Sequence, residues 1–217
     1  MYNSIVRNNS SLGNHAGVFI DNASVTISDC KFYSNQGTTM YSKDGHSVVN
    51  VSNSVFHSNT ADHTIYVREC ALTLTNVTIA YNFGAYGIQV STTSTLILDH
   101  SIIWGHTASP VNVDGSMSAT CSDFPSDSPS GNNISEDPMF CDMDGGNFEL
   151  DAASPCLTGS CGQMGAFGLG CYGAVATEKA NKADNMEIGR FITDSLFTTI
   201  TNVNFDNAKI ESLTKEG

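Results

Sequence analysis

Charged side chains are scarce in this chain of 217 residues. Asp, Glu, Lys and Arg make up 14% of the sequence, and nine basic residues stand against 22 acidic ones, so the net charge is −13. Nucleic acids and anionic membranes are bound through clustered Lys and Arg, which this composition does not supply. We therefore expect no nucleic-acid partner and assign the negative charge to solubility.

Long apolar runs are also missing. No stretch is long enough to cross a bilayer, and no signal-peptide pattern follows Met1. We expect no direct membrane insertion of this segment. Ser4-Ile5-Val6 already matches a strand inside a repeat, and an uncapped first repeat would leave strand edges free. We therefore expect further repeats and an export signal upstream, in a longer protein.

Common catalytic and metal-binding motifs are missing from the sequence as well. It has no nucleophile elbow, phosphate loop or dinucleotide fingerprint, and its seven cysteines lack the paired C-x-x-C spacing of zinc sites. Asp142-x-Asp144-Gly145-Gly146-Asn147 is similar to oxygen-rich calcium loops but lacks the bidentate Glu, so we favour an acidic turn, with calcium as the alternative cofactor. Five histidines fall in turns or separate columns, and we interpret them as solvated residues, not metal ligands: His15, His57, His63, His100 and His106.

A repeated tetrapeptide organises the chain. Phe32-Tyr33-Ser34-Asn35 returns 24 positions later as Phe56-His57-Ser58-Asn59. Self-similarity at this period is typical of a solenoid. Asn tolerates the left-handed backbone of a sharp corner, and its amide can bond the next coil, so we interpret the recurring asparagines as a structural ladder. The ladder ends where His106 takes the next place, and its members are Asn9, Asn35, Asn59 and Asn82.

Three short alternating segments lie in each repeat. In one coil they are Val25-Thr26-Ile27, Cys30-Lys31-Phe32 and Met40-Tyr41-Ser42. Period-2 alternation predicts strands, and a coil of this length can bury its inward side chains only against the next coil. The sequence therefore predicts an all-β, right-handed parallel β-helix over residues 1–117, with about five coils of three short strands each.

Two sets of motifs resemble known families. Phe32-x-x-Asn35 and Phe56-x-x-Asn59 look like the repeats of chlamydial-type polymorphic outer-membrane proteins. The resemblance covers roughly residues 1–171 and implies the β-helix fold and an extracellular or cell-surface location, which N-glycosylation sequons also support. The closing stretch resembles the C-terminal end of secreted bacterial and protist β-helix surface proteins through Asn132-Asn133-Ile134, Asp137-Pro138-Met139-Phe140 and Ala153-Ser154-Pro155-Cys156.

The regular spacing is lost after residue 117. Residues 118–171 are rich in Pro, Gly and Ser, and we expect a looped cap over the last coil. Disulfides are favoured over reduced thiols, which implies an oxidising compartment, and the odd cysteine count leaves at least one thiol free. We pair Cys121 with Cys141, pair two of the last three cysteines with each other, and expect Cys30 to be a free buried thiol. The disulfide candidates are Cys121, Cys141, Cys156, Cys161 and Cys171.

Residues 172–217 differ in composition from the rest. Lys and Glu appear, Cys after Cys171 does not, and apolar residues near helical spacing predict a helix that starts around Asp184. The segment Asp194–Thr201 is rich in β-favouring residues, so a poorly ordered extension is the alternative.

One column of outward residues is the candidate ligand surface. These residues occupy the middle of the strand that follows each ladder asparagine, or His106 in the last coil: Phe19, Tyr41, Tyr66, Gln89 and Asn112. Aromatic rings beside amides suit sugars, which have apolar faces and polar edges. Stacked aromatics can equally serve only to stabilise a parallel sheet, so both interpretations stay open.

Our lead hypothesis is a non-catalytic secreted or cell-surface rod for adhesion, or for recognition of glycans or another surface protein. One alternative is a fragment of a polysaccharide-active enzyme, pectate-lyase-like or a hydrolase, whose catalytic coils lie upstream. Hydrolases of this kind need clustered carboxylates, and the sequence offers only Asp44-Gly45-His46 and the pair Arg68 and Glu69. A structural spacer is the third interpretation.

Overall fold

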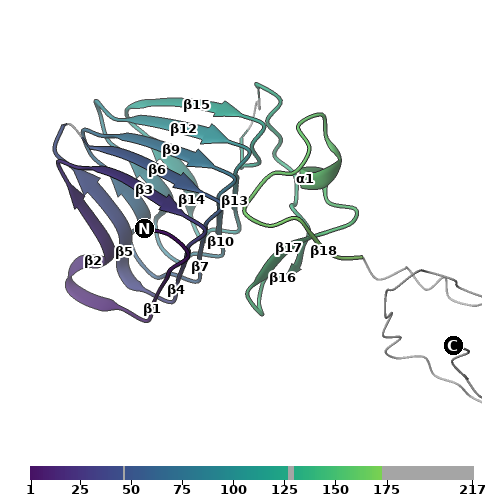
Figure 1. Ribbon diagram of the computed structural model, residues 1–217, viewed down its shortest axis with the longest axis horizontal. Coiled ribbons are helices and arrows are strands. Elements are labelled where there is room, and N and C mark those ends of the chain that lie inside the picture. The colour runs from purple at the N-terminus through teal and green to yellow at the C-terminus, as the bar shows by residue number, and fades with distance from the viewer. Residues whose placement is uncertain (46, 127–129, 173–217) are drawn as a thin grey trace, which may run out of the picture. The chain divides into compact units, whose positions relative to one another are not determined.

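The computed structural model describes residues 1–45, 47–126 and 130–172 (Figure 1). The chain divides into two compact units, and the first, Met1–Ala176, contains all of these residues. The helix predicted from Asp184 lies outside them, as does His46. No helix in the described part is long and apolar enough to cross a membrane.

Each coil contributes one strand to each of three sheets, which Figure 1 shows side by side. Sheet I consists of β1 (Ile5–Arg7), β4 (Lys31–Tyr33), β7 (Val55–His57), β10 (Thr78–Ala80) and β13 (Ile102–Trp104). Sheet II consists of β2 (Ser10–Asp21), β5 (Gln36–Lys43), β8 (His63–Val67), β11 (Tyr86–Val90) and β14 (Ser109–Val113). Sheet III consists of β3 (Ser24–Ser28), β6 (Val48–Ser52), β9 (Ala71–Thr75), β12 (Thr95–Asp99) and β15 (Ser116–Thr120).

Strands three apart in the chain pair in parallel throughout these sheets, which confirms the predicted parallel β-helix. Five strands in each sheet match the five predicted coils. Isolated bridges join Ile102 to Asp123 and Asp123 to Ile134, so the column of sheet I continues past β13. The solenoid makes about seven turns, and the predicted number was slightly low.

The core is a stack of inward-facing columns. Phe32, Phe56, Ile79 and Ile103 are register partners in sheet I, and all four are fully buried. The rings of Phe32 and Phe56 stack with centroids 4.3 Å apart and planes 3° apart. Like residues meet because neighbouring strands are separated by only about 4.8 Å. Burial of each such side chain contributes about 1.5–3 kcal/mol, which a single coil could not obtain.

The predicted asparagine ladder is present at the corner between sheets I and II. Asn9 Nδ2 donates to Asn35 Oδ1 at 3.0 Å, Asn35 Nδ2 to Asn59 Oδ1 at 2.9 Å, and Asn59 Nδ2 to Asn82 Oδ1 at 2.9 Å. Each acceptor oxygen also takes the backbone N–H of the preceding ladder residue, at 3.0 to 3.2 Å. The ladder therefore pairs buried backbone groups that the corner removes from the sheets.

The predicted backbone conformation of the ladder was wrong. The left-handed residue is the one before each asparagine, not the asparagine itself. That placement lets the asparagine side chain turn inward and become buried while the preceding residue makes the bend. The left-handed residues are Asn8, Ser34, Ser58, Tyr81 and Gly105, with φ between 51° and 65°.

Serines perform the same task at the other two corners. Between sheets III and I, Ser54 Oγ accepts from Cys30 N at 3.0 Å, and Ser122 Oγ accepts from Ser101 N at 3.1 Å. Between sheets II and III, Ser47 Oγ accepts from the backbone N–H of the coil before it, at 3.2 Å. These serines were not predicted, although they recur at the same spacing as the asparagines.

The C-terminal piece, residues 137–172, packs on the outer face of sheet I. Ala166 N donates to Thr78 Oγ1 at 2.9 Å, and Phe148 is buried in one cluster with Val55 and Ala80. The approach is closest at Gly165, where φ is +82° and a Cβ would lie 2.8 Å from Thr78 Oγ1. The piece contains β16 (Phe140–Asp142), β17 (Asn147–Asp151), the one-turn helix α1 (Pro155–Thr158) and β18 (Leu169–Cys171).

Residues 118–171, the segment expected to cap the last coil, pack in two places. Phe124 packs against the main core beside Met117 and Ala119, at the end of the coils. The C-terminal piece lies instead along the flank. The reason is that Val55 and Ile102 are apolar and point outward from sheet I, away from the core. The C-terminal piece therefore buries them.

Two disulfides fix this region: Cys121–Cys161 and Cys141–Cys171. The predicted bond between Cys121 and Cys141 is wrong, and so is the predicted bond within the last three cysteines. Cys141 and Cys171 belong to β16 and β18, the two outer strands of the small sheet β16-β17-β18. That sheet was not predicted, so the partners could not be foreseen.

Three cysteines are free and buried: Cys30, Cys70 and Cys156. The prediction for Cys30 is therefore confirmed. Its thiol donates to Ser28 O at 3.0 Å, and the Cys70 thiol donates to Arg68 O at 2.9 Å. Both occupy corner positions where other coils carry serine.

Candidate functional site

The predicted aromatic and amide residues form one column on the outer face of sheet II, here called the outer column. Register pairs join Phe19 to Tyr41, Tyr41 to Tyr66, Tyr66 to Gln89 and Gln89 to Asn112. The structure thus brings all five together in the predicted order. Their role in binding stays a prediction.

The rings of the outer column stack on one another. Tyr41 and Tyr66 have centroids 5.1 Å apart and planes 16° apart, while Phe19 lies 5.6 Å from Tyr41 and is tilted by 49°. Tyr41 is consequently only 8% exposed, whereas Phe19 is 49% exposed. At the far end, Asn112 Nδ2 donates to Gln89 Oε1 at 2.7 Å. The column offers a ligand mainly ring edges, not the open ring faces that the sequence suggested.

Two histidines widen this stack. The His15 ring lies 4.5 Å from that of Tyr41, and the His63 ring lies 5.0 Å from Tyr66 and 5.6 Å from Tyr86. His15 is exposed, but His63 is half-buried. Both stand in strands and not in the expected turns, with their rings against tyrosines; His15 is solvated as expected, whereas His63 is partly covered.

The other histidines differ from one another. His57 stacks on Tyr33 at 5.0 Å and contacts Phe148 at 4.8 Å, and His100 Nδ1 lies 2.8 Å from an oxygen of its neighbour Asp99. Burial lowers the pKa of His57 to about 4 and that of His106 to about 4, so both are neutral at pH 7. His100, with a third of its side chain exposed, is closer to the expected surface histidine than either of them.

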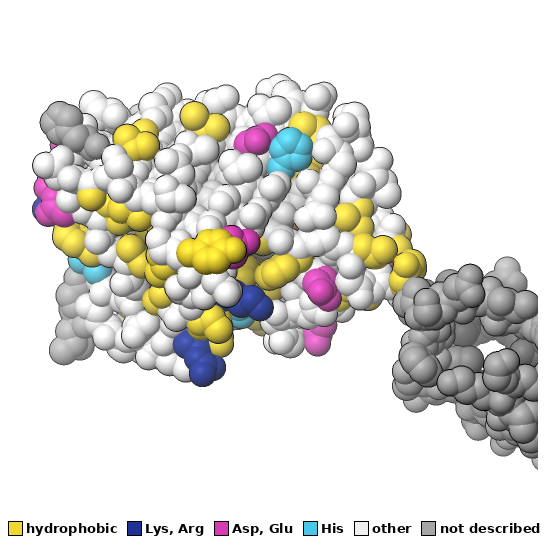
Figure 2. All heavy atoms as spheres, in the orientation of Figure 1, with side chains coloured by type: hydrophobic (Ala, Val, Ile, Leu, Met, Phe, Trp, Pro, Cys, Tyr) yellow, Lys and Arg dark blue, Asp and Glu magenta, His cyan; other side chains and the backbone are white. Residues whose placement is uncertain are grey.

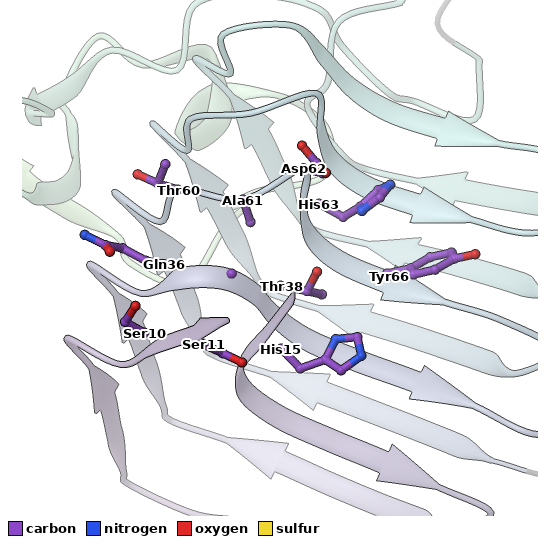
Figure 3. A pocket seen from close by; sticks show the side chains of 11 residues that line it. Ser10, Ser11, His15, Gln36, Thr38, Thr60, Ala61, Asp62, His63 and Tyr66 are labelled. Carbon is purple, nitrogen blue, oxygen red and sulfur yellow. The ribbon is translucent and has the colours of Figure 1, made fainter. Parts of the chain in front are cut away.

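A pocket of about 440 Å³ lies beside the outer column (Figure 3). Figure 3 shows the rings of His15, His63 and Tyr66 on one side of it and Ser10, Gln36 and Thr60 on the other. This sheet II pocket therefore joins aromatic and polar groups. Its lining residues are Ser10, Ser11, His15, Gln36, Gly37, Thr38, Thr60, Ala61, Asp62, His63 and Tyr66.

The pocket arises where corners of different length meet. Asn35 and Tyr41 are six positions apart, whereas Asn59 and Tyr66 are seven apart and the first coil carries the long, irregular β2. The shorter corner, with Gly37 at φ +121°, lies between longer neighbours and leaves a hollow. The polar lining was not predicted, although Ser10, Gln36 and Thr60 directly follow ladder asparagines.

Comparison with known proteins agrees with this architecture. The family model of the right-handed β-helix region matches residues 1–123. The chain belongs to the right-handed β-helix family. This membership confirms the predicted handedness, and it fits surface proteins and polysaccharide-related proteins in general without selecting one role.

A short stretch of this β-helix matches a curated protein. The chain is 51% identical to a hydroxylamine reductase of Halothermothrix orenii over 45 residues. This stretch covers 20% of this chain and 8% of that protein. The match is too short to transfer an activity. No solved structure matches.

The residues that line the sheet II pocket of this β-helix give it little charge. Among its lining residues there is no Lys or Arg, and Asp62 supplies one exposed carboxylate. Burial lowers the pKa of His63, although the charge of Asp62 opposes the shift, so His63 is a neutral ring at pH 7. The groups available to a ligand are thus hydroxyls, an amide, a carboxylate and ring edges, which suit sugar hydroxyls and C–H groups.

The residues that suggested an enzyme lie in surface ion pairs. Lys43 Nζ lies 3.1 Å from Asp44 and 3.3 Å from Asp21, and the hydrogen bond from Lys43 lowers the pKa of Asp44. Arg68 and Glu69 form an exposed pair at 3.7 Å. The lowered pKa keeps Asp44 ionised, whereas a glycosidase needs one carboxylic acid whose pKa is raised so that it can protonate the leaving oxygen.

The predicted acidic turn joins β16 to β17. Asp142 Oδ1 accepts from Gly145 N at 2.9 Å, and Asn147 Oδ1 accepts from Glu149 N at 3.0 Å. These bonds are those of ordinary turns. Within the described ranges, no three His, Cys, Asp or Glu side chains are grouped as a metal ion would require. Calcium at this turn stays the untested alternative.

A buried acid lies where the C-terminal piece meets the last turns. Asp123 is fully buried, and its carboxylate accepts from Cys156 Sγ at 3.3 Å and from Glu136 N at 3.2 Å. Burial raises the pKa of Asp123 to about 7 and also raises the pKa of the Cys156 thiol. The pair is closed to solvent, so we assign it to stability and not to ligand binding.

Proposed function

We propose that this β-helix is a non-catalytic secreted or cell-surface protein that recognises a neutral glycan at the sheet II pocket. The observation that carries the proposal is the meeting of ring edges and uncharged polar groups in one hollow of about 440 Å³. Sugar-binding sites combine apolar contact with a few polar groups that fix orientation. A lining whose charge comes from Asp62 disfavours anionic sugars.

The location rests on separate support. Two disulfides fit an oxidising compartment, and the N-glycosylation sequons fit an exported chain. The test is to tag the protein in its own cells and measure its recovery from the medium or its sensitivity to protease added outside intact cells. Full protection inside the cells would contradict this part of the proposal.

The binding test is a glycan array followed by titration calorimetry with the best ligand. Tyr66→Ala removes a pocket wall, and Asp62→Asn keeps the shape while removing the charged acceptor. Each is expected to weaken binding about tenfold or more, the usual effect of losing a charge-assisted hydrogen bond or an aromatic contact. Tyr2→Ala is the matched control, because Tyr2 is 71% exposed and does not line the pocket.

Circular dichroism of each variant must match that of the parent protein. Unchanged affinity in both Tyr66→Ala and Asp62→Asn would place the site elsewhere. The lack of any retained glycan on the array would instead support the structural spacer.

A further inference from the structure

Four Lys and Arg side chains lie in the part of the chain that the structure describes: Arg7, Lys31, Lys43 and Arg68. Lys43 and Arg68 form ion pairs with neighbouring acids. Arg7 and Lys31 have no acidic partner among the described residues. In a chain with a net charge of −13, two cations without counter-ions on one sheet face call for an explanation.

Both cations point outward from sheet I on adjacent strands. Ile5 pairs with Lys31 and Arg7 pairs with Tyr33, and the residue between them on each strand faces the core. Arg7 and Lys31 are therefore diagonal neighbours on the same face, with Cα atoms on the order of 7 Å apart. Figure 2 shows two groups of dark-blue atoms near each other on the face in view, each beside hydrophobic side chains.

Aromatic rings hold the two cations in place. The Arg7 guanidinium lies 5.8 Å from the ring centroid of Tyr33 and donates to its hydroxyl at 3.1 Å. Lys31 Nζ lies 5.6 Å from the ring centroid of Phe167, which the C-terminal piece supplies. Cation–π contacts restrict long side chains without neutralising them, so the charges stay available to an anion.

The neighbours of the two cations along the face of sheet I add no charge of their own. His57, next along the column after Tyr33, has its pKa lowered first by burial and then by the charge of Lys31, so it adds no cation at pH 7. Ile5 is 61% exposed beside Lys31 and extends the apolar strip formed by the two rings. The face thus offers two fixed cations at the border of an apolar strip.

We propose that Arg7, Lys31, Tyr33 and Phe167 form a binding site for the anionic group of an acidic saccharide, either a carboxylate or a sulfate ester. The Arg fork and the Lys ammonium both suit oxyanions, and the apolar strip suits the C–H face of the sugar that carries the anionic group. An acidic peptide has no such rigid apolar face beside its charge. The site lies on sheet I, is separate from the sheet II pocket, and does not rest on the proposed function.

The test is binding of the full chain to immobilised polysaccharides at low and moderate salt. Polygalacturonate and its methyl ester form one pair, dextran sulfate and dextran form another, and poly-glutamate represents an acidic peptide. The parent protein is expected to bind the anionic member of at least one pair at least tenfold more tightly than the neutral member. The pair that responds distinguishes carboxylate from sulfate ester.

Matched variants locate the site. Arg7→Gln with Lys31→Gln is expected to lower the affinity at least tenfold, whereas Lys43→Gln with Arg68→Gln makes the same change in net charge and is expected to lower it less than threefold. Phe167→Leu keeps the apolar cover but removes the ring under Lys31, and is expected to weaken binding severalfold. Circular dichroism verifies that all variants are folded.

Several results would overturn the proposal. Equal losses in the two double variants would mean that only net charge matters, and equal binding to poly-glutamate would remove the preference for a saccharide. No binding to either anionic polysaccharide at low salt would also overturn it. Tyr66→Ala is expected to leave this binding unchanged, so failure here and failure of the sheet II pocket are distinguishable.

Discussion

Asn59→Ala tests whether the ladder is a main source of stability. The Asn59 side chain is fully buried and makes four hydrogen bonds. Its Nδ2 donates to Phe32 O at 3.0 Å and to Asn82 Oδ1 at 2.9 Å. Its Oδ1 accepts from Asn35 N at 3.1 Å and from Asn35 Nδ2 at 2.9 Å. Alanine removes all four at once.

The expected loss of stability depends on which buried groups keep no hydrogen-bond partner in the variant. Asn82 Oδ1 keeps the Asn59 backbone N–H at 3.0 Å, and Asn35 Nδ2 keeps Val6 O at 3.0 Å. The Asn35 N–H and the Phe32 carbonyl lose the bond to Asn59. A buried group left without a partner costs about 1–3 kcal/mol. We therefore expect a loss of about 4 kcal/mol, or a fall in Tm of roughly 10 °C.

Asn9→Ala is the matched control at the exposed end of the same ladder. It removes one donor, and the Asn9 backbone N–H still reaches Asn35 Oδ1 at 3.2 Å. We expect it to cost less than about 1 kcal/mol. The assay is urea unfolding followed by circular dichroism and by the fluorescence of Trp104, the single tryptophan. Equal losses in the two variants, or a loss below about 1 kcal/mol for Asn59→Ala, would refute the reasoning.

Three further outcomes are expected. Because burial raises the folded-state pKa of Asp123 to about 7 while the unfolded value is about 3.9, its contribution to stability is lost as pH rises between those values. Urea midpoints from pH 4 to 8 should show this fall, and Asp123→Asn should flatten it. Phe56→Ala should cost about 3–5 kcal/mol, whereas Phe19→Ala, at a half-exposed site, should cost much less in the same titration. Gly165→Ala should lower Tm more than Gly162→Ala, since both have positive φ but a Cβ meets close neighbours only at Gly165.

The coils could be predicted from sequence periodicity because each coil has to bury side chains at the same inward positions and turn at the same corners. Phe32 and Phe56 had to be core, and Asn35 and Asn59 had to be at corners, once their spacing was noticed. The left-handed position was missed because nothing in the side chain of Ser58 favours that conformation. The geometry of the corner imposes it, and the ladder bonds compensate for it.

Non-local contacts were beyond the sequence pattern. The disulfide partner of Cys121 depends on how residues 137–172 fold back, and no periodicity describes that segment. One clue was present: Val55 and Ile102 are apolar at outward positions of sheet I, which indicates a covered face. The sheet II pocket was hidden for a different reason, since it depends on a one-residue difference in corner length between Asn35 and Asn59.

The fold-back of the C-terminal piece changes how the coils depend on one another. A bare solenoid has contacts only between neighbouring coils, so its ends can fray while its middle persists. Here Ala166 binds Thr78, 88 positions earlier in the chain. Residues made later thus bind a coil made earlier, which raises the contact order and delays completion of this contact until the segment around Ala166 has been synthesised. Fraying from the last turns must first break this contact, so the late coils should open together and not one by one.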